Sequence, residues 1–103
     1  MEPEWTAVGR IDEFPEGRGR QVRIGARRIG VYRHAGAWFA LKDSCPHAGL
    51  ALHSGLLCDG AVACPGHGWT LDLASGQVRK GGSGKQVASY PVRLVGDVVE
   101  VGV

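Results

Sequence analysis

The sequence has no long hydrophobic run and few cysteines, and each absence excludes a class of protein. No stretch reaches the roughly 20 apolar residues of a membrane helix, so we expect no membrane partner. The start, Met1-Glu2-Pro3-Glu4-Trp5, is acidic and no apolar segment follows it. This differs from a signal peptide and predicts a cytoplasmic protein. The three cysteines are too few, and odd in number, for a disulfide framework. In a reducing compartment, cysteines near histidines more often bind metal.

A strong charge of one sign is also lacking. Twelve Lys and Arg residues against ten Asp and Glu give a formal net charge of +2, which is too small to indicate nucleic-acid binding. An acid-free run from residue 18 to 33 contains six arginines, and we interpret it as the solvated face of a hairpin. A nucleic-acid patch and a partner-docking surface are the alternatives. No base-stacking motif accompanies the run, so no nucleic-acid partner is expected.

Helical periodicity is nearly absent, whereas short alternating segments are frequent. Seventeen glycines and five prolines interrupt the chain every few residues, which is typical of strands and tight turns. Ile29 and Val31 are expected to face the core, and Trp38 and Phe39 are interpreted as core residues. Asp59-Gly60 is a strong hairpin signal. Strands are predicted at residues 5–8, 21–24, 28–33, 37–41, 56–58, 61–63, 69–73, 87–95 and 98–101.

This meander predicts one all-β domain over residues 1–103, a small antiparallel barrel or sandwich. Two loops, residues 43–55 and 64–68, interrupt the rhythm of strands. Pro46 favours an extended backbone, in which residues i and i+2 point the same way. Pro65-Gly66 is a good turn centre, which brings residues i and i+3 together. Each loop therefore presents one cysteine and one histidine to a common site: Cys45 and His47, and Cys64 and His67.

Two thiolates and two imidazoles suit either of two cofactors. One is tetrahedral zinc. The other is a [2Fe–2S] cluster in which two histidines replace two cysteines on one iron. Zinc fingers typically pair two cysteines and then two histidines, not one of each per loop. Gly49, Gly66 and Gly68 would let backbone N–H groups approach the sulfurs of a cluster. The pattern favours the cluster, and zinc remains the alternative.

These loops resemble the two cluster-binding loops of the Rieske [2Fe–2S] family: Ser44-Cys45-Pro46-His47-Ala48-Gly49 and Cys64-Pro65-Gly66-His67-Gly68-Trp69. The resemblance covers in effect the whole chain, including residues 38–41, Asp72 with Ser75-Gly76, and residues 90–92. It implies the family's small antiparallel β domain, with both loops at its tip. It also implies one cluster per chain, with Cys45 and Cys64 on the buried iron and His47 and His67 on the outer iron.

High-potential members of that family differ from this chain at four positions. They have cysteines where this chain has Leu50 and Gly66, so the disulfide that bridges their loops is absent here. They have hydroxyl residues where this chain has Trp69 and Leu71. Because hydroxyl groups that donate hydrogen bonds to cluster sulfurs raise the potential, the resemblance implies a low value, roughly −150 mV. A third family loop usually carries a proline, and residues 79–89 have none.

The pattern is similar to soluble Rieske ferredoxins that serve aromatic-ring oxygenases. It implies a one-electron carrier between a flavin-dependent NAD(P)H reductase and a terminal oxygenase or reductase, with no catalytic residue of its own. The alternatives are a small subunit of an NADH-dependent nitrite reductase, a zinc-stabilised interaction module and a DNA-binding redox sensor. Outside the four ligands, Cys58 is interpreted as a small strand residue. His53 is expected to be a solvated loop histidine.

Overall fold

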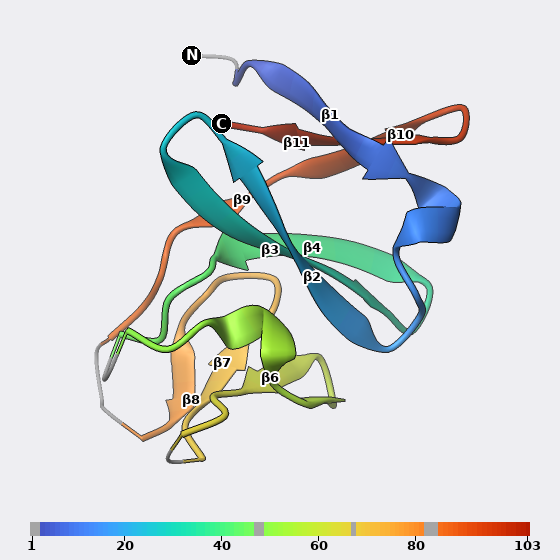
Figure 1. Cartoon of the computed structure of the whole chain (residues 1–103). Helices are drawn as coiled ribbons and strands as arrows, with labels where there is room; N and C mark the ends of the chain where they lie inside the picture. The colour runs from blue at the N-terminus through green and yellow to red at the C-terminus, as the bar shows by residue number, and fades with distance from the viewer. Residues whose placement is uncertain (1–2, 47–48, 67, 82–84) are drawn as a thin grey trace.

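The computed structural model describes residues 3–46, 49–66, 68–81 and 85–103, and these ranges form strands and short turns without an α-helix (Figure 1). No helix in these ranges is long and apolar enough to cross a membrane. Two 3-10 turns occur, η1 Ile11–Glu13 and η2 Leu52–Ser54. The strands are β1 Trp5–Arg10, β2 Arg18–Ile24, β3 Arg27–His34, β4 Ala37–Lys42, β5 Leu57–Cys58, β6 Ala61–Ala63, β7 Thr70–Asp72, β8 Val78–Lys80, β9 Ser89–Tyr90, β10 Val92–Val95 and β11 Val98–Gly102.

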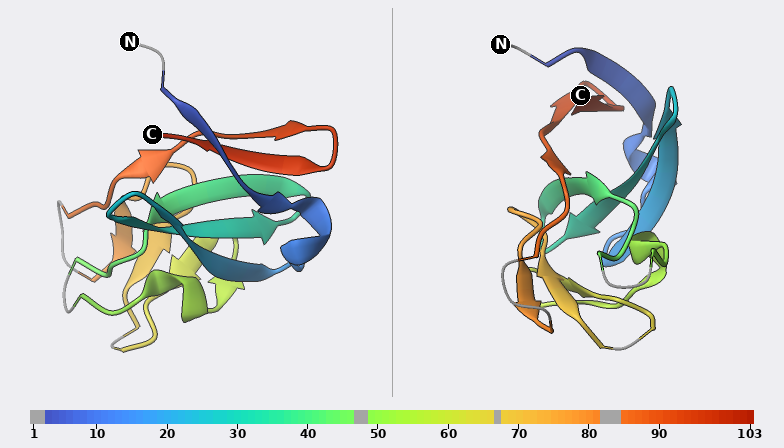
Figure 2. Two further views of the ribbon diagram at one scale, coloured as in Figure 1. Left: turned by 45° about the horizontal axis from the view of Figure 1, so that its top comes forward. Right: turned by 90° about the vertical axis from the view of Figure 1, so that its left-hand side faces the viewer.

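The strands form three antiparallel sheets. Sheet A has the order β1-β11-β10, sheet B the order β2-β3-β4-β9, and sheet C the order β5-β6-β7-β8. Sheet B lies between the other two, and sheet C is at the far end of the molecule from sheet A (Figures 1 and 2). The all-β prediction is confirmed. Because each sheet stays open in the described ranges, the architecture is sandwich-like and not a closed barrel.

Two groups of buried residues lie on opposite faces of sheet B because side chains alternate along its strands. On β3, Ile29 and Val31 are buried in the core, as predicted, on the side of sheet A, and Tyr32 faces sheet C. The group toward sheet A contains Phe14, Ile29, Val31, Ala40, Val99 and Val101. The group toward sheet C, here called the cysteine cluster, contains Tyr32, Leu41, Cys45, Leu52, Val62, Cys64, Leu71, Leu73 and Val87. Trp38 and Phe39 are partly buried and pack against different groups.

One predicted strand is divided in the structure, and one strand was missed. Residues 87–95 form two strands, because Pro91 has no N–H to donate and separates β9 from β10. β9 pairs with β4, whereas β10 pairs with β11, so the chain passes from sheet B to sheet A at this proline. β8 was not predicted, since its three residues show no alternation of apolar and polar side chains.

Candidate metal centre

Cys45 and Cys64 are both buried within the cysteine cluster, with exposed fractions of 1% and 3%. Neither forms a disulfide. Cys58, in contrast, is exposed on β5, where the sequence placed it in a strand. The predicted histidine ligands His47 and His67 lie outside the described residues. The described residues by themselves contain no group of three or more metal-binding side chains.

Backbone hydrogen bonds close the first loop around Cys45. The Cys45 N–H donates to the carbonyl of Leu50 at 2.7 Å, and the Gly49 N–H donates to the carbonyl of Cys45 at 2.8 Å. Gly49 has φ 70°, a left-handed conformation that glycine adopts without strain. The Gly49 N–H is therefore used within the loop, and the approach of other backbone N–H groups to cluster sulfurs stays a prediction.

The second loop is the connection of a hairpin between β6 and β7. The two strands pair up to Ala63 opposite Thr70. One step further, the Cys64 N–H donates to the carbonyl of Trp69 at 2.6 Å. Cys64 thus follows directly on a paired strand, and sheet C fixes its backbone.

The two loops touch each other at Leu50 and Gly66. A Cβ atom added at Gly66 would lie 2.5 Å from Leu50 Cδ1 and 4.0 Å from the Cys64 sulfur. Leu50 therefore covers the second loop beside Cys64. Leu50 and Gly66 are the two positions at which, by the resemblance described above, high-potential Rieske proteins have the cysteines of a disulfide. In this chain an apolar contact joins the loops at these positions instead.

Gly55 brings the end of the first loop against the strand that leads into Cys64. A Cβ atom at Gly55 would overlap the carbonyl oxygen of Ala63 and lie 3.0 Å from its carbonyl carbon. The Ala63 N–H donates to the carbonyl of Leu56 at 2.8 Å. Only a residue without a side chain fits this approach.

Asp43 is a buried acid two residues before Cys45, and no pattern in the sequence predicted its role. Its carboxylate accepts hydrogen bonds from Gln21 Nε2 at 2.6 Å and from the His53 N–H at 2.8 Å. His53 Nδ1 lies 2.6 Å from the same carboxylate. His53 is therefore a bound, partly buried residue, and its expected solvation was wrong.

The Tyr32 side chain lies in the same cluster as the two cysteines. Its hydroxyl is buried and has no hydrogen-bond partner in the described part of the chain. Burial, and then the charge of Asp43, raise the pKa of Tyr32 far above its ordinary value, so the phenol stays neutral. The ring occupies space left by two glycines, because a Cβ at Gly19 or Gly30 would lie within 2.8 Å of Tyr32 atoms.

A polar network supports the turns of sheet C. Asp72 accepts hydrogen bonds from the N–H and the hydroxyl of Ser75, both at 2.9 Å, and forms an ion pair with Arg79. Arg79 also donates to the carbonyl of Asp59 at 2.7 Å, which joins two hairpin turns. Desolvation opposes ionisation of Asp72, but the hydrogen bonds from Arg79 and Ser75 outweigh it and lower its pKa.

The donor chemistry of this centre fits an iron–sulfur cofactor. Soft thiolates select zinc, copper(I) and iron–sulfur clusters, and both buried cysteines belong to loops in direct contact. Leu71, where high-potential proteins have a hydroxyl residue, is fully buried and apolar. Apolar surroundings of this kind limit access of solvent to a metal centre.

Comparisons with known proteins identify the family. Residues 4–91 match the model of the Rieske [2Fe-2S] domain. The chain belongs to this family, and its cofactor is a [2Fe-2S] cluster.

A curated relative and two solved structures cover nearly the whole chain. The chain is 36% identical over 100 residues to the anthranilate 1,2-dioxygenase ferredoxin subunit of Burkholderia cepacia, covering 97% of this chain and 93% of that subunit. It is similar to a chain in the complex of reduced oxygenase and oxidized ferredoxin in carbazole 1,9a-dioxygenase, with TM-score 0.86, 26% identity, and 95% and 92% coverage. It also matches the fold of a putative NADH-dependent nitrite reductase small subunit from Mycobacterium tuberculosis, with TM-score 0.89, 21% identity, and 98% and 95% coverage.

Proposed function

We propose that Cys45, His47, Cys64 and His67 hold the [2Fe-2S] cluster, within a single domain that spans residues 1–103. The cysteines would bind the buried iron and the histidines the outer iron. The support is that Cys45 and Cys64 are buried in one apolar cluster, and that each has a histidine two or three residues further along. Mixed cysteine and histidine ligation is the mark of Rieske centres.

The protein is proposed to carry single electrons from a flavin-dependent NAD(P)H reductase to a terminal oxygenase or reductase, and to turn over no substrate itself. The observation that carries this proposal is the 36% identity to a dioxygenase ferredoxin subunit along almost the full length of both chains. The complex of oxygenase and ferredoxin in carbazole 1,9a-dioxygenase supports the same class of partner. When bound, the cluster accepts and releases one electron.

The chain's own residues keep the cysteine side of the centre dry and fixed. Leu50 packs over Gly66, Gly55 lies against Ala63, and Asp43 ties the first loop to β2 and η2. A rigid site needs little rearrangement when its charge changes. Since Leu71 cannot donate a hydrogen bond, we propose a potential at the low end of the family range, roughly −150 mV.

Two alternatives predict different observations. A nitrite reductase small subunit would depend on a nitrite-reducing partner, and its support here is a likeness at 21% identity, which concerns the fold alone. A zinc-stabilised module would be colourless. The cytoplasmic location stays a prediction; the exposed, unpaired thiol of Cys58 supports a reducing compartment.

Electron transfer can be tested by exchange within a known system. The anthranilate 1,2-dioxygenase system of Burkholderia cepacia would be assembled without its ferredoxin subunit, and this protein added in cluster-loaded form. Anthranilate-dependent NADH consumption should return, and the Cys64→Ala variant should not restore it. If NADH and the reductase reduce this protein but the oxygenase does not turn over, a role as electron donor to oxygenases is contradicted. The protein could also carry a cluster that dithionite reduces and yet exchange electrons with neither the reductase nor the oxygenase. That result would contradict the carrier role in this class of system.

A further inference from the structure

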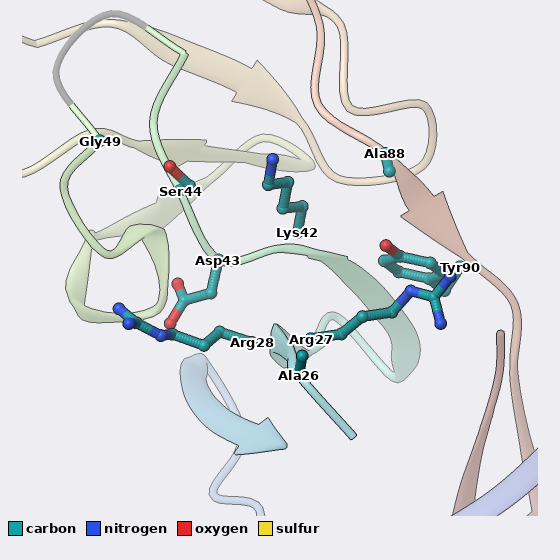
Figure 3. A pocket seen from close by; sticks show the side chains of 9 residues that line it. All are labelled: Ala26, Arg27, Arg28, Lys42, Asp43, Ser44, Gly49, Ala88 and Tyr90. Atoms are coloured by element: carbon teal, nitrogen blue, oxygen red, sulfur yellow. The ribbon is translucent and has the colours of Figure 1, made fainter. Parts of the chain in front are cut away.

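A cleft of about 510 Å³ lies beside the first loop and is lined by three cations (Figure 3). Arg27 and Arg28 come from the start of β3, and Lys42 ends β4. In Figure 3 the Arg28 side chain extends toward Asp43, whereas Arg27 extends toward the opposite wall. The cleft is outside the proposed ligand set, but Asp43, Ser44 and Gly49 of the first loop form part of its lining.

The charges of this cleft are unbalanced. Arg27, Arg28 and Lys42 have no ion-pair or side-chain hydrogen-bond partner in the described ranges, whereas the arginines that do have an acidic partner there are Arg10, Arg20, Arg79 and Arg93. Asp43 is the one acid in the lining, and its side chain is fully inaccessible and already bound to other groups. An anion that enters the cleft therefore meets cations that lack partners among the described residues.

The walls of the cleft are held together by backbone hydrogen bonds. The Asp43 N–H donates to the carbonyl of Arg28 at 2.9 Å, and the Lys42 N–H donates to the carbonyl of Ala88 at 2.8 Å. The cations thus project from joined strands and not from a separate loop. A preformed arrangement of charges binds a partner with a smaller loss of conformational entropy.

The position of the cleft matters for electron exchange. Ser44 in its lining precedes Cys45, and the Gly49 N–H donates to the Cys45 carbonyl. A group seated on Arg27 and Lys42 is therefore next to the loop that carries one proposed pair of ligands. With the cluster held by the proposed ligands, a protein that exchanges electrons with it would approach these loops.

We propose that this cleft is the docking site for an acidic segment, rich in Asp or Glu, of the protein with which this chain exchanges electrons. The choice of a protein as occupant rests on the proposed function. Arginine binds carboxylates in a bidentate fork, and complementary charges steer association and set the orientation of the partner. Two of the six arginines in the acid-free run of residues 18–33 thereby gain a role in partner docking.

The test uses cluster-loaded protein and a fluorescein-labelled hexaglutamate peptide, followed by fluorescence anisotropy at low ionic strength. The variants Arg27→Glu and Lys42→Glu should each weaken binding about tenfold, since charge contacts are strong at low salt. Arg18→Glu is the matched control. Arg18 and Arg27 are exposed arginines at opposite ends of the same β2–β3 ladder, and Arg18 is not in the cleft. The affinity of the Arg18→Glu variant for the peptide should stay within about twofold of that of the original protein.

Four results would overturn the docking proposal. One is an equal loss of affinity in Arg18→Glu, which would mean that only net charge matters. Another is displacement of the peptide by inorganic phosphate at the same concentration of charge, which would mean a site for small anions. A third is binding of duplex DNA with the same dependence on Arg27. The last is a wild-type protein that binds no peptide.

The peptide readout is separate from electron transfer. A protein that binds no peptide but still passes electrons would refute the docking site alone, and a protein that binds the peptide but cannot be reduced would refute the carrier function alone. The visible spectrum of each variant checks that the cluster is retained. If Arg27→Glu does not fold, Lys42→Glu decides the outcome.

Discussion

Gly55→Ala should loosen the cysteine loops, because this glycine sets how closely they approach. Gly55 has φ −75° and ψ 162°, a conformation open to any residue, so the effect of alanine is purely steric. The added methyl would overlap the backbone carbonyl of Ala63 and also lie 3.1 Å from Val62 Cγ2. The hydrogen bond from the Ala63 N–H to the carbonyl of Leu56 holds the two segments together beside this contact.

The size of the effect follows from this geometry. The two segments must separate by about 1 Å or more before the methyl and the carbonyl reach ordinary van der Waals contact. Overpacking of this kind costs about 3 kcal/mol in the free energy of unfolding. With a urea dependence of about 1.5 kcal/mol per molar, the unfolding midpoint should fall by about 2 M. The segment that moves leads into Cys64, so cluster retention should fall as well.

Gly66→Ala is the matched control for this experiment. Neither Gly55 nor Gly66 has a positive φ. Among the described residues, the methyl at Gly66 would clash with the tip of Leu50 alone and would lie 4.0 Å from the Cys64 sulfur. Leu50 is 40% exposed, so its side chain can turn away. Its cost should stay below about 1 kcal/mol. Both variants would be unfolded in urea anaerobically, followed by circular dichroism and visible absorbance. If the midpoint and cluster content of Gly55→Ala match those of Gly66→Ala, the close approach does not set the loop spacing.

Three further predictions concern buried or bound polar groups. Asp43→Ala leaves Gln21 and His53 without their acceptor and should destabilise the protein by about 3 kcal/mol in urea unfolding; a loss below about 0.5 kcal/mol would mean that water replaces the carboxylate. The folded-state pKa of Asp72 is lowered, so its contribution to stability is present above its unfolded pKa of about 4 and is lost as pH falls through the folded value. Asp72→Asn should lower the free energy of unfolding by about 1 kcal/mol at pH 7 and reduce the loss of stability at acid pH. An unchanged dependence of stability on pH would refute this role of Asp72. Tyr32→Phe removes a buried hydroxyl without a partner among the described residues and should be neutral or stabilising within about 1 kcal/mol in the same assay; a larger loss would show that the hydroxyl has a partner.

The sequence predicted the sheet pattern well because alternation and turn residues act locally. The Asp59-Gly60 hairpin forms as predicted, with positive φ at both residues. The sequence also predicted that the two loops meet, and Leu50 against Gly66 confirms their contact. That the four residues bind the cluster stays a prediction.

What the sequence could not reveal depends on contacts between distant segments. Asp43 is an ordinary polar residue in the sequence, and its burial becomes visible only when Gln21 and His53 are placed around it. The same is true of Gly55, whose role comes from a carbonyl eight residues away. The basic cleft likewise combines β3, β4 and the first loop, so no single stretch of sequence displays it. Local patterns fixed the strands here, while tertiary packing assembled the site.

The central claim, that Cys45, Cys64 and two histidines hold a [2Fe-2S] cluster, is tested most directly by visible and low-temperature EPR spectra before and after dithionite. The protein should be brown, bleach on reduction and give a rhombic signal with an average g of about 1.9, as expected of mixed histidine and cysteine ligation. A colourless, EPR-silent protein that contains one zinc per chain after anaerobic preparation would contradict this claim and make the four residues a structural zinc site.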